Sequence, residues 1–433
     1  MPPHYAPDHP TDHPEELHIT ALGAQGDGIA ETAAGPRYVA FALPGERVVS
    51  ASGDGLPRLV SDPSPDRVAP VCRHFGVCGG CAAQHMSERL YADWKREIVV
   101  AALRQRGLRP AVAPLERVGY GTRRRAVLTA RRTGGHVRLG YHRRRSAELV
   151  DIGECPVLVD ALAAGLPALR ALAAALPGPE LRMTVLATAA GLDVAVETAG
   201  GRLGREAVVA LGQLAARHGL PRVAVDGEIV IERARPAVPM GDVDVSVPPG
   251  VFVQATRQSE AIMRALIAAA LAGARPKHVA DLFCGVGTFT FELARRARVL
   301  ALDSDGTAIA ALAAAGRQAQ GLKPIEVRAR DLVREPLSAK ELEPFDAVVL
   351  DPPRAGAAKQ AHELARSSVA TIVAVSCDGG TFARDAQILV DGGYTLAEVT
   401  PIDQFVRSAH VETVAVLRRA PGRRGTARRR LLR

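Results

Sequence analysis

Two short apolar runs in the C-terminal half of the chain each end in a side chain that can do chemistry. Residues 373–375 lead through Ser376 to Cys377, and residues 345–350 lead directly to Asp351. Short β-branched runs stopped by turn signals are typical of buried strands in a parallel sheet. Because such sheets bind ligands at the carboxyl ends of their strands, we expect a thiol and a carboxylate at one crevice. The thiol could act as a nucleophile, although a single cysteine in an apolar run is more often an inert core residue.

Length and composition limit the class of protein. The 433 residues are too many for one hydrophobic core and predict two to four domains. The longest apolar stretch, residues 265–272, is shorter than the roughly 18 residues that a membrane helix needs. Residues 1–16 have neither a basic start nor an apolar centre, which argues against a signal peptide. We therefore expect a cytoplasmic protein with no membrane partner.

Charge and cysteine content indicate the kind of partner. The net charge is +9, the isoelectric point is about 9.6, and arginine supplies most of the excess. This balance favours a polyanionic partner, since the planar guanidinium group pairs well with phosphate. Six cysteines in a cytoplasmic chain favour metal binding or catalysis over disulfides.

Four of these cysteines form a candidate metal site. Cys72, Cys78 and Cys81 lie close together in the sequence, and Cys155 lies far along the chain and is followed by proline. A closing Cys-Pro is typical of iron–sulfur ligand sets, and tetrahedral zinc is the alternative that the spacing leaves open. The spacing does not match the three-cysteine signature of radical S-adenosylmethionine enzymes. We expect a structural or RNA-positioning role, because the site would join distant segments.

Two further regions carry strand patterns. Residues 18–60 alternate short apolar runs with glycines, which predicts a small β-barrel. Residues 123–125 and 143–145 are all arginine, and tyrosine and histidine stand beside them. Arginines interleaved with aromatic rings suit a surface that holds RNA phosphates and stacks unpaired bases, and a solvated charged hairpin is the alternative. Residues 158–247 carry no motif and are interpreted as scaffold.

The C-terminal part repeats a strand that ends in an acid. Such strands end at Asp281, Asp303 and Asp331, and the first leads into a turn with Gly285 and Gly287. Glycines let the backbone approach a ligand, and an acid after the second strand can accept hydrogen bonds from ribose hydroxyls. Together with an Asp-Pro-Pro-Arg run, these strands indicate an S-adenosylmethionine-dependent methyltransferase domain. Nicotinamide binding is less favoured, because threonine replaces the third glycine of that fingerprint.

Several motifs together resemble one family. Gly26-Asp-Gly-Ile-Ala and Leu43-Pro-Gly-Glu-Arg-Val are similar to a TRAM domain, a small RNA-binding barrel. Asp351-Pro-Pro-Arg, Val375-Ser-Cys-Asp and His410-Val-Glu follow in the order and spacing of bacterial RNA uracil-5-methyltransferases. The chain resembles the branch that acts on 23S rRNA and carries both a TRAM domain and an iron–sulfur cluster. The resemblance covers nearly the whole chain and is most specific in its C-terminal third.

The resemblance implies an α/β protein. A Rossmann-like methyltransferase domain would follow an OB-like TRAM β-barrel and a central α+β RNA-binding domain with the four-cysteine site. The implied cofactors are S-adenosylmethionine and a 4Fe-4S cluster, and the implied partner of the monomer is RNA in an unfolded or single-stranded loop. The implied divisions are a disordered N-terminus (1–16), the barrel (17–68), the central domain (69–248), the methyltransferase domain (249–419) and a basic tail (420–433).

The resemblance also implies roles for individual residues. Cys377 would add to C6 of uracil and so make C5 nucleophilic, and Glu412 would later remove the C5 proton. Asp351 would orient the uracil beside the cofactor. The residues that map onto cofactor contacts are Gln254, Phe283, Gly285, Gly287, Thr288, Asp303, Asp331 and Asp351, and those that map onto cluster ligands are Cys72, Cys78, Cys81 and Cys155.

Four residues at three places depart from the family pattern. Asp378-Gly379 stands in place of Asn-Pro, Val406 in place of proline, and Thr256 in place of asparagine. Asp378 is expected to raise the pKa of the neighbouring thiol and slow its attack. Two alternative functions are open. One is a tRNA uridine-5-methyltransferase, and the other is an RNA-binding protein with a vestigial methyltransferase site.

Overall fold

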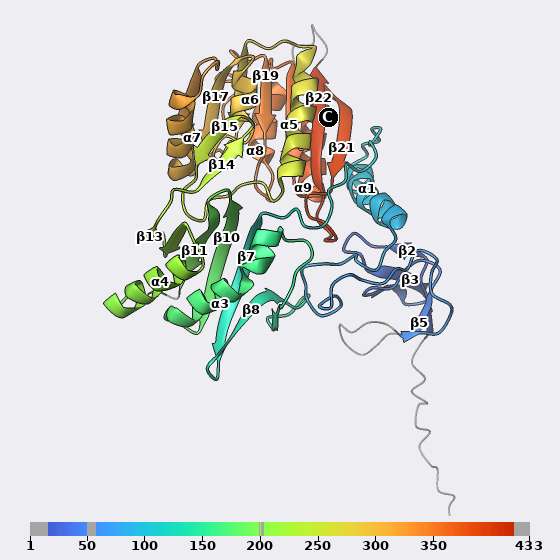
Figure 1. The fold of residues 1–433 in the computed structure, drawn as a ribbon. Helices are drawn as coiled ribbons and strands as arrows, with labels where there is room; N and C mark the ends of the chain where they lie inside the picture. Colours follow the sequence, from blue (N-terminus) through green and yellow to red (C-terminus); the bar gives the residue numbers. More distant parts are fainter. Residues whose placement is uncertain (1–15, 50–57, 199, 201–202, 420–433) are drawn as a thin grey trace, which may run out of the picture.

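A computed structural model describes residues 16–49, 58–198, 200 and 203–419 (Figure 1). The predicted basic tail, and residues 1–15 of the predicted disordered N-terminus, lie outside the described residues. Glu16, which the sequence assigned to the N-terminal segment, already belongs to the first strand. Across the described part of the chain, no helix is long and apolar enough to cross a membrane.

The N-terminal region forms two small three-stranded sheets, as the short glycine-bounded runs predicted. Leu17, Ile19, Ala30 and Val48 are buried in one apolar cluster between them, an arrangement consistent with a barrel-like domain. The first sheet contains β1 (Glu16–His18), β5 (Arg47–Val49) and β6 (Arg58–Leu59), and the second contains β2 (Ala21–Leu22), β3 (Gly28–Thr32) and β4 (Gly35–Val39).

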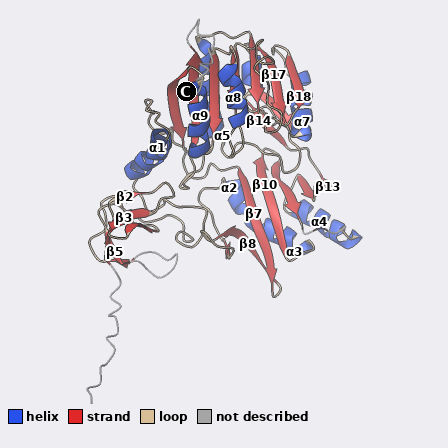
Figure 2. Ribbon diagram, turned by 180° about the vertical axis from the view of Figure 1, so that it is seen from behind, coloured by secondary structure: helices blue, strands red, loops and turns tan. Residues whose placement is uncertain are grey.

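The central region is one seven-stranded sheet with three helices packed against it. Figures 1 and 2 show it beside the N-terminal sheets and below the C-terminal sheet. The helices are α2 (Asp160–Ala164), α3 (Leu166–Ala175) and α4 (Arg205–Arg217). The strands, in spatial order, are β13 (Glu228–Glu232), β12 (Arg222–Val225), β11 (Gly191–Glu197), β10 (Glu180–Thr188), β7 (Arg125–Thr133), β8 (His136–His142) and β9 (Leu149–Asp151).

The C-terminal sheet has five parallel strands and a final antiparallel pair, which confirms the predicted Rossmann-like α/β fold. Its inner strands are apolar along their length because helices cover both faces. Parallel pairing brings the carboxyl ends of neighbouring strands to one edge. The spatial order is β18 (Ile325–Ala329), β17 (Arg298–Asp303), β16 (His278–Leu282), β19 (Ala347–Leu350), β20 (Thr371–Ser376), β22 (Glu412–Arg419) and β21 (Tyr394–Ile402).

Two apolar cores lie on the two faces of this sheet. One contains side chains of α5 (Arg257–Ala272), α6 (Thr290–Ala294), α7 (Gly306–Gln318) and the hairpin of β14 (Ala237–Met240) and β15 (Val243–Ser246). The other contains α8 (Ala358–Arg366), α9 (Gly379–Asp391) and α1 (Glu88–Gln105). Although the sequence placed α1 in the central domain, its Val99 and Leu103 are buried in this methyltransferase core.

Helix α1 also anchors the loop of residues 403–411 between β21 and β22, which we call the base loop. Lys95 is fully buried, and its Nζ lies 3.0 Å from Asp403 Oδ1. The same ammonium donates to the backbone carbonyls of Phe405 and His410. On the other side, the Arg407 carbonyl accepts hydrogen bonds from two amides of residues 82–83, which follow the cysteine segment. The base loop is therefore fixed from both sides just before Glu412.

Replacing Lys95 by methionine is expected to lower the free energy of unfolding by about 3–5 kcal/mol, because Asp403 would keep a buried charge without its cation. Arg89→Met on the same helix is the matched control. Arg89 is 72% exposed in its pair with Asp66, so its loss should cost less than about 1 kcal/mol. Urea unfolding followed by circular dichroism measures both losses. Equal losses would contradict a dominant role for the Lys95 ion pair.

Candidate active site

The predicted thiol nucleophile and carboxylate base lie at neighbouring strand ends. Strand β20 ends at Ser376 and pairs antiparallel with β22, so that Ser376 faces Thr413. Continuing this register by one residue sets Cys377 opposite Glu412. Residues opposite each other in an antiparallel pair have Cβ atoms about 4.5–5.5 Å apart. The sheet therefore brings together two groups that are distant in the sequence.

Two glutamines join Glu412 to Asp351, which follows the neighbouring strand β19. Gln254 Nε2 donates to Asp351 Oδ2 at 2.9 Å. Gln404 Nε2 donates to Gln254 Oε1 at 2.8 Å and to Glu412 Oε2 at 2.7 Å. Gln254 was predicted only as a cofactor contact. Gln404 was missed, although it stands inside the Asp-Gln-Phe run next to the predicted motif.

The two carboxyl groups have strongly perturbed acidity. Glu412 is 2% exposed, and its Oε1 has no hydrogen-bond partner among the described residues. Burial and the nearby Asp351 charge raise the pKa of Glu412 well above its usual range, against the hydrogen bond from Gln404. Burial also raises the pKa of Asp351, against the hydrogen bond from Gln254. An enclosed carboxyl with one free oxygen and a raised pKa suits a general base.

The thiol of Cys377 is protonated at neutral pH in the free protein. Burial, together with the charges of Glu412 and Asp351, raises its pKa to about 11, while Arg354 acts in the opposite direction. Asp378 was predicted to raise the pKa of this thiol. In the structure its carboxylate instead caps α9, accepting a hydrogen bond from the Thr381 amide at 2.9 Å. The acids that raise this pKa are therefore the two functional candidates, and Arg354 is a site residue that the sequence analysis did not assign.

Predicted cofactor residues lie at the carboxyl ends of β16 and β17. Asp303 Oδ2 accepts from the Gly285 amide at 2.9 Å and holds the glycine turn against β17. Gly287 has φ +99°, and a Cβ there would lie 2.7 Å from a ring carbon of Phe291. Phe283 begins the same turn at φ +63°, a left-handed conformation that non-glycine residues seldom adopt. The backbone of this turn therefore adopts a conformation that few residue types tolerate.

Three other residues near the carboxyl ends of these strands, Thr288, Asp331 and Asp281, differ in exposure and hydrogen bonding. Thr288 is partly exposed in the glycine turn. Asp331, beyond the end of β18, accepts hydrogen bonds from the Val333 and Arg334 amides at 3.0 and 3.1 Å. Asp281 is fully buried, and it accepts a hydrogen bond of 2.6 Å from Thr290, the residue in place of the third glycine. Asp281 therefore supports the turn from beneath.

The segment that contains Gln254 connects the central sheet to the active site. Thr256, which replaces the family asparagine, caps α5 by accepting from the Ser259 amide at 3.0 Å, and either residue type serves as an N-cap. Arg124, just before β7, donates to the Gln254 carbonyl at 3.1 Å. Its guanidinium also forms a buried ion pair with Glu260 of α5. These contacts fix Gln254 from the side of the central domain.

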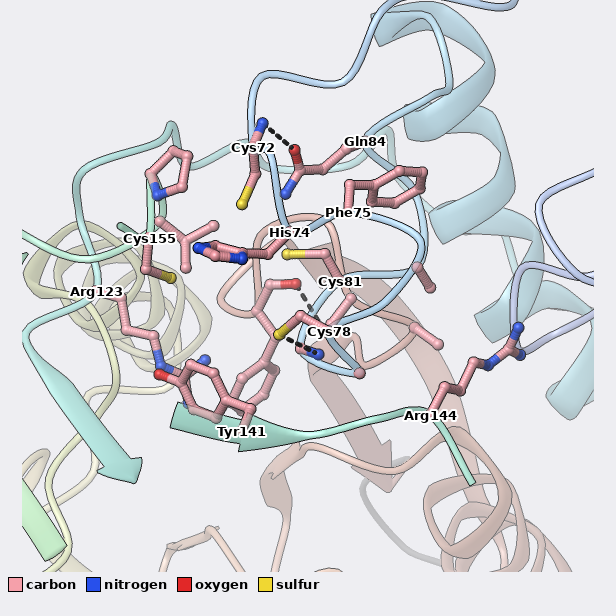
Figure 3. Close-up of a pocket in the computed structure, with 18 of the residues that line it drawn as sticks. Cys72, His74, Phe75, Cys78, Cys81, Gln84, Arg123, Tyr141, Arg144 and Cys155 are labelled. Carbon is pink, nitrogen blue, oxygen red and sulfur yellow. Dashed lines mark hydrogen bonds between the residues drawn. The ribbon is translucent and has the colours of Figure 1, made fainter. Parts of the chain in front are cut away.

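The four predicted metal ligands line one cavity of about 370 Å³ next to the base loop. Figure 3 shows their sulfur atoms facing a common space. Among the residues that the structure describes, no three Cys, His, Asp or Glu side chains form a set that could hold a single metal ion. The cavity is lined by Cys72, Cys78, Cys81 and Cys155 and also by Arg354, Phe405 and His410.

Close backbone packing holds the cysteine segment against the hairpin of β8 and β9. The Gly79 amide donates to the His142 carbonyl at 2.9 Å, and a Cβ at Gly79 would lie 2.7 Å from that oxygen. Burial and the neighbouring thiols raise the pKa of Cys81 to about 11 and that of Cys155 to about 12. Four thiolates at this place therefore require a cation among them.

The arginine-rich hairpin is partly engaged within the protein. Arg144 and Arg145 both pair with Asp27, which is 2% exposed in the N-terminal sheets. Arg143 pairs with Glu148 at 3.0 Å. Arg144 is mostly buried in its pair, whereas Arg143 and Arg145 are 39% and 61% exposed. Arg144 thus docks the N-terminal sheets, and the other two arginines can still meet phosphates.

Comparisons with known proteins find a matching family model and similar RNA methyltransferases. A family model described as tRNA (uracil-5-)-methyltransferase matches residues 246–420. An uncharacterized RNA methyltransferase of Rhizobium meliloti (strain 1021) is 50% identical over 92% of this chain and 98% of its own length. A 23S rRNA (uracil(1939)-C(5))-methyltransferase of Halomonas elongata is 32% identical over 93% of this chain and 89% of its own length.

A solved structure has the same fold over nearly the whole chain. It is the tRNA (uracil-54, C5)-methyltransferase of Pyrococcus abyssi in complex with S-adenosyl-L-homocysteine. The TM-score is 0.71 at 24% sequence identity, and the match covers 94% of this chain and 100% of that chain.

Cys377 is expected to react slowly with iodoacetamide at about pH 7, because its thiol is protonated at that pH. Wherever Glu412 is ionised, Glu412→Gln should speed the reaction, since it removes the carboxylate charge that raises the thiol pKa. Arg354→Met should slow it, since removing the positive charge raises that pKa further. Peptide mapping by mass spectrometry separates Cys377 from the other cysteines. Faster alkylation in Arg354→Met than in the wild type would contradict this assignment of charges.

Proposed function

The chain belongs to the RNA uracil-5-methyltransferase family, and on this premise we propose that it methylates C5 of a uridine in 23S rRNA with S-adenosylmethionine as methyl donor. The observation that carries the proposal is the strand register that sets Cys377 opposite Glu412. C5 methylation needs a nucleophile at C6 and a base at C5, and this register supplies both. The relative that acts on 23S rRNA supports the choice of RNA.

In the first half of the proposed reaction, the sulfur of Cys377 forms a bond to C6 of uracil. The thiol proton leaves to a neighbouring carboxylate or to water, and the C5–C6 electron pair becomes an enolate. C5 then takes the methyl group from the sulfonium, and S-adenosylhomocysteine leaves. Arg354 favours the thiolate, since its charge lowers the pKa of Cys377.

In the second half, Glu412 removes the proton from the methylated C5. The electron pair of that C–H bond restores the C5–C6 double bond and expels the thiolate of Cys377, while Glu412 becomes protonated. The free Oε1 of Glu412 is the atom available for this proton. The raised pKa of Glu412 makes the carboxylate a stronger base than an exposed glutamate.

S-adenosylmethionine would lie across the carboxyl ends of β16 and β17. The glycine turn would let the cofactor approach the backbone closely. Asp303, at the end of β17, would accept hydrogen bonds from the ribose hydroxyls. Asp351 would lie between the cofactor and the uracil, held by Gln254. The other residues that we assign to cofactor contacts are Phe283, Gly285, Gly287, Thr288 and Asp331.

We also assign a 4Fe-4S cluster to Cys72, Cys78, Cys81 and Cys155. A single zinc ion needs four sulfurs at about 2.3 Å from one point, whereas the thiolates of a cluster bind separate irons around a larger core. The cavity that all four cysteines line supports this assignment. The bound cluster would supply a structural tie between residues 72–81 and Cys155.

The RNA would enter as an unfolded or single-stranded segment, because C5 and C6 must be reached from the faces of the base, which stacking would cover. Phe252 is 60% exposed two residues before Gln254, and the Arg125 guanidinium lies 5.3 Å from its ring centroid. An exposed ring beside arginine suits stacking of a free base. The N-terminal sheets would act as the TRAM-type RNA module.

All the reacting groups come from one chain, so we propose a monomer, working in the cytoplasm with its ribosomal substrate.

A tRNA substrate is the second candidate, because the family model that matches residues 246–420 is described for tRNA. Nucleoside analysis of purified 23S rRNA and tRNA from wild-type and deletion cells separates the two. The proposal expects 5-methyluridine to be lost from 23S rRNA alone. Loss confined to tRNA would overturn the ribosomal assignment, and no loss from either RNA would favour a vestigial site.

The two halves of the reaction predict different failures. Cys377→Ala should bind RNA and S-adenosylmethionine, form no covalent adduct and lose at least about a thousandfold in methyl transfer. Glu412→Gln should attack and methylate but stall with RNA attached, in an adduct that survives denaturing electrophoresis and carries the methyl group. Wild-type protein should stall in the same way on 5-fluorouridine RNA, since fluorine cannot leave as a proton does. Substantial turnover by Cys377→Ala would exclude this nucleophile.

Protein purified without oxygen should be brown and contain iron and acid-labile sulfide. Cys155→Ala should lose the iron and lower the thermal unfolding midpoint, because the tie between distant segments is broken. Cys284→Ala is the matched control, since Cys284 is buried in the glycine turn away from the cavity and should retain the iron. Colourless protein with one equivalent of zinc would contradict the cluster.

A further inference from the structure

Gln404 uses every hydrogen-bonding group of its side chain inside the active site. It lies in the base loop and is 2% exposed. Its Oε1 accepts from Ser259 Oγ at 2.7 Å. A primary amide nitrogen carries two hydrogens. Gln404 Nε2 spends both, one on Gln254 Oε1 and one on Glu412 Oε2.

The direction of these bonds is fixed by the groups at their ends. If the Gln404 amide were reversed while Glu412 is ionised, its oxygen would face both the Glu412 carboxylate and the Gln254 carbonyl oxygen, and three acceptors would meet without a hydrogen. Gln254 is fixed in the same way, because its nitrogen must donate to Asp351. The amides therefore have only one arrangement that satisfies both carboxylates.

A hydroxyl pair completes the chain on the other side. Ser259 Oγ and Thr256 Oγ1 are 2.7 Å apart. Ser259 has one hydroxyl hydrogen, which goes to Gln404, so the Thr256 hydroxyl donates to Ser259. Both residues lie at the start of α5 and are fully buried. The start of this helix therefore sets the orientation of Gln404, and Gln404 sets the orientation of Glu412.

We infer that Gln404 is a positioning residue for the second half of the reaction, holding Oε2 of Glu412 so that its free Oε1 faces the C5 proton. The inference rests on the proposed function and deepens it. Gln404 touches the base and does not touch the reacting atoms, so its loss should leave the attack by Cys377 and the methyl transfer largely intact. What should suffer is proton removal and release of the RNA.

The charges around Glu412 predict a second effect of losing Gln404, which is a change in the pH dependence of turnover. Asp351 faces Glu412 from the end of β19, Cys377 faces it from the end of β20, and Arg354 lies beside Cys377. Within the base loop, the charge of Asp403 is paired with Lys95 from α1. The hydrogen bond from Gln404 opposes the rise in the pKa of Glu412, so removing it should raise that pKa further. The base would then ionise only at higher pH.

The test compares Gln404→Met, which is similar in volume but has no donor, with Gln404→Glu, which keeps the shape and replaces the donor by a carboxylate. Gln360→Met is the matched control. Gln360 is also a buried glutamine of this domain, 1% exposed, and it bonds both backbone groups of Leu337 far from the site. Substrates are 23S rRNA transcribed with uridine or with 5-fluorouridine, and the donor is S-adenosylmethionine with a labelled methyl group.

With 5-fluorouridine RNA, Gln404→Met should form the covalent adduct within about threefold of the wild-type rate. With uridine RNA its turnover should fall by about 10- to 100-fold, part of the full effect of a general base, and a methylated adduct should accumulate on denaturing gels. The acidic limb of the pH–turnover profile should move to higher pH. Gln404→Glu should stall more strongly, and Gln360→Met should show neither accumulation nor a moved profile.

Equal losses of adduct formation and turnover in Gln404→Met, with no accumulated adduct, would overturn the positioning role and leave the proposed function standing. The same conclusion would follow if Gln404→Glu turned over at the wild-type rate. If the wild-type protein itself formed no adduct with 5-fluorouridine RNA, the proposed function would fail, and this inference would fail with it.

Discussion

The buried ammonium of Lys95 is the constraint on which the candidate active site depends. A fully buried cation is stable only where acceptors surround it, and here these are the Asp403 carboxylate and two carbonyls of the base loop. Since Glu412 follows the loop directly and begins β22, the ion pair determines where the base enters the sheet.

The cysteine segment and the central domain both contact the base loop. The Arg407 carbonyl accepts from the amides of Ala82 and Ala83, immediately after Cys81. From the central domain, the Arg123 guanidinium lies 5.8 Å from the ring centroid of Phe405. The cysteine segment and the base loop that precedes Glu412, the proposed base, are therefore parts of one packed unit, although they lie far apart in the sequence. A cluster at the cysteines can thus matter to catalysis through position alone, without any electron transfer.

The sequence predicted best what depends on local pattern. Cys377 and Asp351 could be placed at strand ends because apolar runs stopped by turns define those ends. Glu412 needed the resemblance, since its burial and its place opposite Cys377 come from the antiparallel pairing of β22. Lys95 and Gln404 were not predicted, because a lysine on an apolar helix face and a glutamine in a loop show no local pattern, and they contact Asp403 and Gln254, about 300 and 150 residues away.

The raised pKa values of Cys377, Asp351 and Glu412 fit the proposed chemistry. In the free protein, Asp351 and Glu412 raise the pKa of Cys377, and Asp351 also raises that of Glu412, while Arg354 acts on the thiol in the opposite direction. In the proposed complex, the positive sulfonium of S-adenosylmethionine would lie on the side of Asp351. An opposite charge nearby lowers the pKa of acids, so donor binding would offset the repulsion that keeps the thiol protonated. Under this proposal, ionisation of Cys377 would be coupled to the presence of the methyl group that it helps to transfer.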